Sequence, residues 1–530
     1  MEPSRAERLA VVVIVAGAFA AVLAVLPYRL FELDRFLVPK EVVLHTTAAL
    51  TALLLLPGRS RLDGTPADVL LLAYLGLSMV SAALAPNPWL ALRAVGITWS
   101  GLVLFWSARE LARAGLQRAL LMGLSVAAVT GIASALLQAY GLADSVYFSR
   151  NRAPGGTFGN RNFAAHLAAL ALPSLLMVVI QARHRSGYWL GVLGILLSST
   201  FLVLSRSRAA WLAVLASFTV GGGLAIAGGL WRDAVARRRL RGPLLATALG
   251  CALALGLPNA LNWRSDSPYS DTLRDIANFQ EGSGRGRLIQ WTRSLVMAAH
   301  DPILGVGPGN WPVRYPGFAQ PDDPSLDGEA MAANPWPSSD WVAFLSERGL
   351  PAFLCLVLVG LSLLIAGVQA WLGGRRDATD LAGLALAMTL AAAVVVGAFD
   401  AVLLLPVPTI FAWVLLGVLS PVDEPYLTRA FRLPARLALA AAVVIVGTGL
   451  TVRSASQSAA MGVFSSWGRL SARAEAARLD PGSYRIRILL AESYRRRGRC
   501  RDAIPHARAA GRLFPEAPAP RRILRVCGER

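Results

Sequence analysis

Residues 9–26 read LAVVVIVAGAFAAVLAVL and contain no charged side chain. The hydrocarbon core of a membrane is about 30 Å thick and each helical residue rises about 1.5 Å, so about 20 mainly apolar residues cross it as a helix. Arg5 and Arg8 precede the stretch, but other apolar segments follow quickly and no small-residue cleavage site stands out. We therefore predict a retained transmembrane helix rather than a cleaved signal peptide.

Similar apolar stretches recur along the whole chain. Its composition is 55% hydrophobic and 16% charged, with a mean hydropathy of +0.51, whereas soluble domains are about 25% charged. Hydropathy predicts about thirteen spans, near residues 9–27, 41–57, 67–85, 95–108, 118–140, 163–181, 188–204, 209–230, 244–260, 348–371, 381–398, 400–420 and 436–453. The predicted fold class is all-α, a polytopic membrane helix bundle of about 12–13 spans.

The basic residues are placed as membrane topology requires. The net charge is +20, and Lys40 is the only lysine. No nucleic-acid motif accompanies the charge, so we expect no nucleic-acid partner. If the N-terminus is cytoplasmic, every inward loop is basic, as the positive-inside rule predicts; these loops carry Arg59 and Arg61, Arg109 and Arg113, Arg183 and Arg185, the run 237–241, Arg375 and Arg376, and Arg429, Arg432 and Arg436.

Two hydrophilic regions fall on the outer side of the membrane by this count. The first is a large loop at about residues 261–347, and the second is the tail from residue 454 to 530. In the tail, Pro481 and Pro515 are one tetratricopeptide period apart, and small and large residues alternate between them as in a helix pair of that repeat. An unspecialised amphipathic hairpin is the alternative. Fewer than three repeats seldom stand alone, so we expect the tail to rest on the membrane domain or on a partner.

A glycine-rich stretch lies at the outer end of one span. Residues 155–163 read GGTFGNRNF. Glycines let the backbone approach a ligand closely, and Asn160, Arg161 and Asn162 supply donors for sugar hydroxyls or phosphate oxygens. Most glycine-rich loops are simply turns, so the stretch alone is a weak signal.

Arg206 and Arg208 interrupt an apolar hairpin on the same side. Ionisable residues beside membrane spans tend to be functional, and interfacial snorkelling is the alternative. The outer loop then gives GRGRLIQW at 284–291, DPILGVGPGNW at 301–311, SSDW at 338–341 and ERGLP at 347–351. Taken together and in this order, the motifs resemble the O-antigen ligase and polymerase family over about residues 155–419.

The resemblance implies a membrane glycosyltransferase that takes a glycan from undecaprenyl diphosphate on the periplasmic face of the bacterial inner membrane. It implies a lipid, glycan or protein acceptor, and no cofactor or essential metal. Membrane lipids and an assembly protein on the tail are the other expected partners. The implied domains are a transmembrane glycosyltransferase domain at residues 1–453 and a tetratricopeptide-like periplasmic tail at 454–530.

The arginines suit this chemistry, because a departing diphosphate develops negative charge that guanidinium groups hold bidentately. Arg161, Arg208 and Arg287 match the family's motif positions, and Arg206 and Arg285 are their neighbours. A structural ion pair is the alternative for Arg161 and Arg287.

The sequence departs from the family at one position. Family ligases carry a His-Asn pair before the Asp-Trp motif, and that His is the proposed base, whereas this chain has Ser338 and Ser339. A serine does not act as a base at neutral pH without help. We therefore predict Asp340 as the base and Glu347 as the second candidate. Helix capping is the alternative role for Asp340.

The predicted catalytic residues are thus Asp340, Arg287 and Arg208. The predicted substrate-binding residues are Arg161, Asn160, Asn162, Arg206, Arg285 and Glu347. Two other functions stay open: a non-catalytic scaffold that binds lipid-linked glycan, and a flippase or transporter. Arginines gathered on one face disfavour the transporter, because transporter sites lie near the midplane.

Cys500 and Cys527 lie in the tail, where an oxidising compartment would permit a disulfide. Their positions in the repeat are offset by about two helical turns from a full period. We therefore favour two unpaired thiols, and the alternative is a disulfide that a bend or a short last helix would permit.

Overall fold

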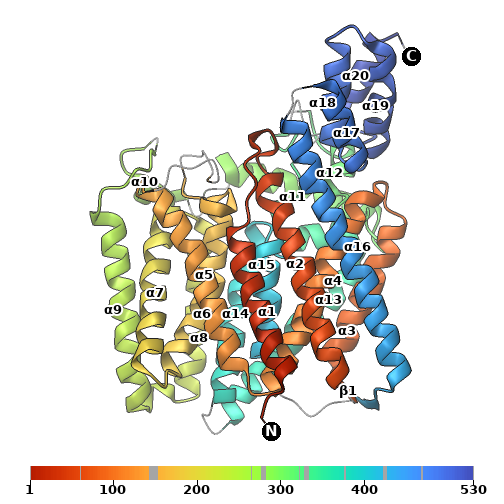
Figure 1. The fold of residues 1–530 in the computed structure, drawn as a ribbon. Coiled ribbons are helices and arrows are strands. Elements are labelled where there is room, and N and C mark those ends of the chain that lie inside the picture. The colour runs from red at the N-terminus through yellow and green to blue at the C-terminus, as the bar shows by residue number, and fades with distance from the viewer. Residues whose placement is uncertain are drawn as a thin grey trace.

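The structure is a computed structural model that describes residues 2–59, 61–142, 148, 153–263, 265–275, 278, 282–321, 323–326, 334–374, 378–421, 427–466 and 469–528. Arg375 and Arg376, predicted in a basic inward loop, lie outside the described residues. Within those ranges nearly all regular structure is helical, and the helices run side by side in one bundle (Figure 1). The predicted all-α membrane bundle is therefore confirmed.

Eleven helices of the described chain are long and apolar enough to cross a membrane. Each lies at a predicted span; they are α1 (Arg5–Leu23), α2 (Asp34–Leu55), α3 (Pro66–Ala83), α4 (Pro88–Arg113), α5 (Gln117–Ala139), α6 (Arg161–Ile180), α7 (Arg185–Ser205), α8 (Arg208–Ala227), α13 (Asp340–Gly373), α14 (Ala378–Phe399) and α16 (Leu433–Ser466).

The other two predicted spans are helices of different character. α9 (Ala234–Gly256) begins with the arginine run 237–241, which lowers its hydropathy. α15 (Pro406–Leu419) has only 14 residues, about 21 Å of helix, and every one of them is buried. The chain is a multi-pass membrane protein in which α15 fills the middle of the bundle.

Polar side chains set where the helices begin. Ser4 and Glu7 form a reciprocal capping box at the start of α1, and Asn87 caps α4 by accepting from the backbone of Trp89 and Leu90. Ser339 caps α13 by accepting from the backbone N–H of Val342. Such caps satisfy N–H groups that have no partner inside the helix.

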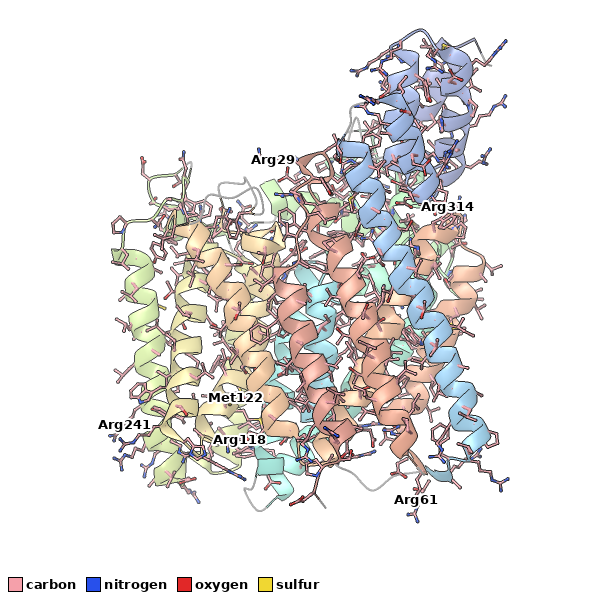
Figure 2. All side chains as sticks on the ribbon, viewed as in Figure 1. Arg29, Arg61, Arg118, Met122, Arg241 and Arg314 are labelled. Atoms are coloured by element: carbon pink, nitrogen blue, oxygen red, sulfur yellow. A yellow bond between two sulfur atoms is a disulfide. The ribbon has the colours of Figure 1, made fainter. Side chains whose placement is uncertain are left out.

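The two ends of the bundle differ. One end of the bundle, which we call the N-terminal end, carries the N-terminus, Arg61, Arg118 and Arg241 of the basic first part of α9 (Figures 1 and 2). The opposite end, which we call the tail end, carries the outer-loop helices and the C-terminal tail (Figure 1). The outer-loop helices are α10 (Pro268–Arg274), α11 (Gly282–His300) and α12 (Trp311–Arg314).

Short elements complete the connections. A two-stranded antiparallel sheet of β1 (Arg61–Gly64) and β2 (Leu427–Ala430) lies at the N-terminal end, with Arg61 opposite Ala430. The 3₁₀ turns of the described residues are η1 (Arg29–Phe31), η2 (Leu56–Gly58), η3 (Gly156–Phe158), η4 (Leu230–Arg232) and η6 (Tyr315–Gly317).

After α16, the described part of the tail contains four helices, α17 (Leu470–Leu479), α18 (Tyr484–Arg495), α19 (Cys500–Leu513) and α20 (Pro518–Val526). Its hydrophobic core also includes Ala460, Met461 and Phe464 of α16, which therefore joins the membrane bundle to the tail. Asn87 donates to the carbonyl of Leu513 at 3.1 Å, so the tail rests on the bundle. The tetratricopeptide assignment stays a prediction.

The expectation of unpaired tail thiols is wrong. Cys500 and Cys527 form a disulfide, with their Cα atoms 5.3 Å apart. The helical offset is overcome because α20 is short: Cys527 sits just past its C-terminal end and faces Cys500, the first residue of the antiparallel α19.

Candidate active site

The predicted arginines come from three separate segments at the tail end. Arg161 is the first residue of α6, Arg206 and Arg208 lie at the sharp turn between α7 and α8, and Arg287 lies in the second turn of α11. Each is half-buried. Arg206 has a left-handed backbone with a φ of 52°, which is uncommon for residues other than glycine.

The glycine-rich stretch fixes the start of α6. The Thr157 hydroxyl donates to the carbonyl of Val22 at 2.5 Å, and the Gly156 N–H donates to Gln138 Oε1 at 2.7 Å. Gly159 has a φ of 74°, and a Cβ there would lie 2.2 Å from the Phe36 ring. The stretch therefore packs tightly against α1, α2 and α5, and Arg161 follows it directly.

Arg161 and Arg206 share one aromatic neighbour. Their guanidinium carbons lie 5.4 and 4.7 Å from the ring centre of Trp263. Arg206 also donates from Nε to the Thr272 hydroxyl at 2.7 Å, and Arg208 donates to the carbonyl of Asp275. The first part of the outer loop, residues 261–275, thus orients these side chains.

Arg287 belongs to the same electrostatic group. Burial lowers the pKa of its guanidinium, the charge of Arg208 lowers it further, and Asp400 opposes both effects. Arg161 in turn lies within electrostatic range of Arg206 and Arg208. We call Arg161, Arg206, Arg208 and Arg287 the arginine cluster.

Carboxylates lie within electrostatic range of the cluster: Asp271 and Asp275 act on Arg206, and Asp400 acts on Arg287. Among the described residues, Arg161, Arg206 and Arg287 form no salt bridge with a carboxylate. Burial also lowers the pKa of Arg206, while the charges of Asp271 and Asp275 raise it, so the arginines gather in a poorly solvated place. Such a place favours an anion with several oxygen acceptors.

Two residues outside the predicted set complete the site. Asp400, half-buried after α14, accepts from Asn162 Nδ2 at 3.3 Å and from the Ala401 N–H at 2.9 Å. His166, one turn beyond Asn162, is fully buried, and neither ring nitrogen has a hydrogen-bond partner among the described residues. It lies within electrostatic range of Asp400 and Arg287. An acid between two apolar spans is the signal that would have identified Asp400.

Asp340 lies next to the turn that carries Asp400, and both of its carboxylate oxygens bind backbone N–H groups. It is fully buried, and its two carboxylate oxygens accept from the backbone N–H groups of Val402 and Leu403, each at 2.9 Å. Its own N–H donates to the carbonyl of Asp400 at 3.2 Å. Asp340 thus anchors the turn that carries Asp400, while the cap of α13 is Ser339.

Glu347 also binds backbone. Its carboxylate accepts from the N–H groups of Gly309 at 2.8 Å and Trp311 at 3.2 Å. The glycine-rich segment around Gly307 packs onto α13 at a kink where Gly349 has a φ of 77° and its Cβ would lie 2.1 Å from the carbonyl of Ile303. The motif at 301–311 therefore shapes the start of α13.

The remaining predicted residues have simpler surroundings. Asn160 caps α6 by accepting from the N–H of Asn162 at 2.8 Å. Arg285 is exposed, two residues before Arg287 and therefore on another face of α11. Ser338, at the position of the missing histidine, is held by its backbone: its N–H donates to Gln290 at 2.7 Å.

No group of three or more His, Cys, Asp or Glu in the described part of the chain is arranged to hold a metal ion. Residues 193–357 match the sequence model of the family described as O-antigen ligase. The chain carries an O-antigen ligase domain. No curated protein matches the sequence.

The O-antigen ligase family performs glycan transfer in O-antigen assembly, which makes a glycosyltransferase-type enzyme the activity that the match supports. The matched residues of this ligase domain include Arg206, Arg208 and Arg287. Arg161 and Asp400 lie outside the matched segment and reach the site through the fold.

Proposed function

We propose that this protein transfers or polymerises glycan from an undecaprenyl diphosphate carrier on the periplasmic face of the inner membrane, in O-antigen or exopolysaccharide assembly. The observation that carries the proposal is the arginine cluster. Three segments far apart in sequence bring four guanidinium groups into one electrostatic group at one end of a membrane bundle. A lipid diphosphate presents its head group at that depth.

The cluster would act on the leaving group. As the bond between the anomeric carbon and the diphosphate breaks, the diphosphate leaves with the electron pair and gains negative charge. Preorganised guanidinium groups stabilise that charge more than the ground state, and so lower the barrier. The Trp263 ring, which contacts both Arg161 and Arg206, would hold these two guanidinium groups in position for the diphosphate.

The acceptor hydroxyl must lose a proton as its oxygen bonds to the anomeric carbon. We assign that proton to Asp400, because it is half-buried, lies near Arg287 and retains lone pairs beside its two hydrogen bonds. Asp340, the base predicted from the motif, has both oxygens occupied by backbone donors, and we assign it the positioning of the Asp400 turn. A single displacement of this kind inverts the anomeric centre.

The orientation follows from charge. The N-terminal end carries the arginine-rich loops, so the positive-inside rule makes it cytoplasmic. The tail end, with the cluster and the tail disulfide, would then face the periplasm, where disulfides persist.

The test is a deletion of the gene in the bacterium that encodes it, followed by analysis of lipid-linked glycans. A polymerase predicts accumulation of single repeat units on the carrier, and a ligase predicts accumulation of finished chains. Complementation by Arg287→Ala separates enzyme from scaffold, because a scaffold role tolerates that change and the enzyme does not. An unchanged glycan pool in the deletion would reject the proposed function.

A further inference from the structure

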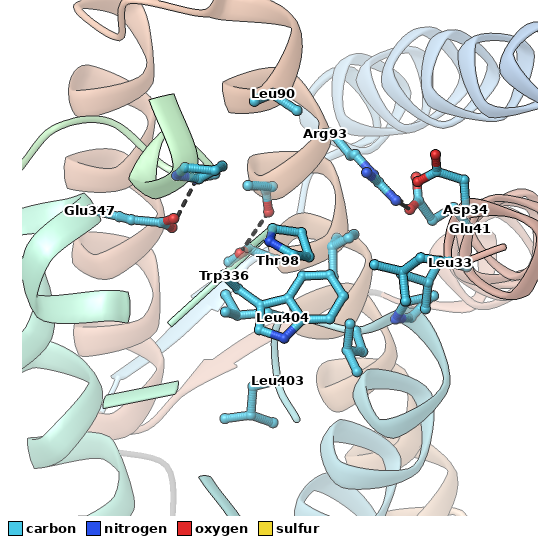
Figure 3. Close-up of a pocket in the computed structure, with 18 of the residues that line it drawn as sticks. Leu33, Asp34, Glu41, Leu90, Arg93, Thr98, Trp336, Glu347, Leu403 and Leu404 are labelled. Carbon is cyan, nitrogen blue, oxygen red and sulfur yellow. Dashed lines mark hydrogen bonds and ion pairs between the residues drawn. The ribbon is translucent and has the colours of Figure 1, made fainter. Parts of the chain in front are cut away.

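A cavity separate from the arginine cluster opens where the tail meets the bundle (Figure 3). Its volume is about 130 Å³, which leaves room for a small molecule. Helices α2, α4 and α13 supply its walls, the segment 403–406 its inner side, and Phe514 of the tail one edge. We call it the seam pocket.

Two residues that line the seam pocket have buried polar atoms without a partner. Glu41 is fully buried; its Oε1 accepts from Arg93 at 2.7 Å, whereas Oε2 has no hydrogen-bond partner among the described residues. Arg348 is 1% exposed, and its Nε likewise has none in that part of the chain. One atom accepts and the other donates, and a hydroxyl group can serve either of them because it does both.

The remaining lining also suits a sugar. Trp336 is half-buried and offers an indole ring, which Figure 3 shows between the Arg93–Glu41 pair and Glu347. Three carboxylates, of Asp34, Glu41 and Glu347, face two arginines, Arg93 and Arg348, so the formal charge of the lining is −1. That balance disfavours a phosphate and distinguishes this pocket from the arginine cluster.

We propose that the seam pocket binds an uncharged sugar unit of the acceptor glycan, and that the tail completes this site through Phe514. That this sugar belongs to the acceptor glycan rests on the proposed function. Sugars are recognised by aromatic faces together with hydrogen bonds from charged side chains.

The pocket is placed to deliver a hydroxyl to the proposed base. Leu403 and Leu404 line it, and they follow Asp400 in the turn that Asp340 anchors. Trp336 also lines it, and its ring lies 6.2 Å from that of Phe163, which comes two residues after Arg161. The 400–404 turn and Trp336 thus lie between the seam pocket and the arginine cluster.

The experiment measures the binding of two probes to the whole protein in nanodiscs, the first by proton saturation-transfer NMR and the second, which has no carbon-bound protons, by phosphorus-31 NMR. The first is a panel of neutral disaccharides with gluco, galacto, manno and rhamno units, and the second is inorganic pyrophosphate. We expect at least one disaccharide to bind, about three- to tenfold more weakly in Glu41→Gln and about tenfold more weakly in Trp336→Ala. Arg287→Ala should retain disaccharide binding and lose pyrophosphate.

Two matched controls lie far from the pocket. Glu110→Gln alters a carboxylate that pairs with Arg59 and Arg113, and Trp189→Ala removes an indole that is 62% exposed. Both should bind the disaccharide as the unaltered protein does.

Absence of binding by every disaccharide, or binding unchanged in both Glu41→Gln and Trp336→Ala, would overturn the inference. Binding lost in Arg287→Ala would place the sugar in the arginine cluster and would overturn it as well. If the unaltered protein binds a disaccharide but no pyrophosphate, the result would instead count against the proposed function.

Discussion

The two neighbouring aspartates give the sharpest prediction, because the same substitution should have opposite effects at each. Asp400→Asn removes the proposed base, and Asp340→Asn removes the anchor of the turn that carries it. Asp400 is half-buried, and an amide oxygen can still accept from Asn162 or from the Ala401 N–H. Asp340 is fully buried between two backbone donors.

The magnitudes follow from these contacts. A hydrogen bond to a charged acceptor contributes about 1.5–3 kcal/mol, and a buried donor without a partner costs about 1–3 kcal/mol. Asparagine at position 340 keeps one oxygen and turns an NH₂ group toward the other N–H, so Asp340→Asn should lower the free energy of unfolding by about 3 kcal/mol. Asp400→Asn should change it by about 1 kcal/mol or less, while slowing transfer by about 10²- to 10⁴-fold.

The assay compares unfolding by denaturant with single-turnover transfer in proteoliposomes for both variants. The expected pattern is a stable, inactive Asp400→Asn and a destabilised Asp340→Asn whose folded fraction retains part of its rate. A stable but inactive Asp340→Asn beside an active Asp400→Asn would refute the assignment and return the role of base to Asp340.

Three further predictions concern topology, the tail and the backbone at the α7–α8 turn. A cysteine introduced by G317C should react with a membrane-impermeant thiol reagent from the periplasm, and one at R238C only from the cytoplasm; the reverse pattern would invert the membrane orientation. Cys527→Ser should destabilise the tail by roughly 3–4 kcal/mol in the chain-entropy model, as measured by proteolysis of the tail, and equal resistance in both proteins would contradict it. Arg206→Gly should be about 1 kcal/mol more stable than Arg206→Ala, because glycine adopts the left-handed backbone without cost, while both lose activity; equal stability would remove the strain.

Hydropathy predicted the bundle because each span is a continuous apolar run, whether it faces lipid or other helices. It misplaced the start of α13 by eight residues, at Arg348 rather than Asp340. Asp340 and Glu347 were predicted in the loop and Arg348 at the start of the span, but in the fold each charge is matched by backbone N–H groups or hydroxyls. Such local compensation depends on segments distant in sequence, so composition cannot reveal it.

The candidate site was predictable only in part for a similar reason. The arginines stand out as charges beside spans, and the order of the motifs links them. The contact between Asn162 and Asp400 joins residues more than two hundred positions apart, and no local pattern encodes it. For the tail disulfide, the repeat period favoured unpaired thiols, and the short α20 that permits the bridge was only the alternative.

The central claim is that the arginine cluster stabilises a departing diphosphate. The most direct measurement is the single-turnover transfer rate of Arg287→Ala and Arg287→Lys in proteoliposomes, with a lipid-diphosphate-linked glycan as donor. Loss of one preorganised donor typically removes about 3–4 kcal/mol of transition-state stabilisation, so the alanine variant should be slowed about 10²- to 10³-fold. The lysine variant should recover only part of the rate, since an ammonium lacks the planar fork of the guanidinium. A near-normal rate in folded Arg287→Ala would contradict the claim.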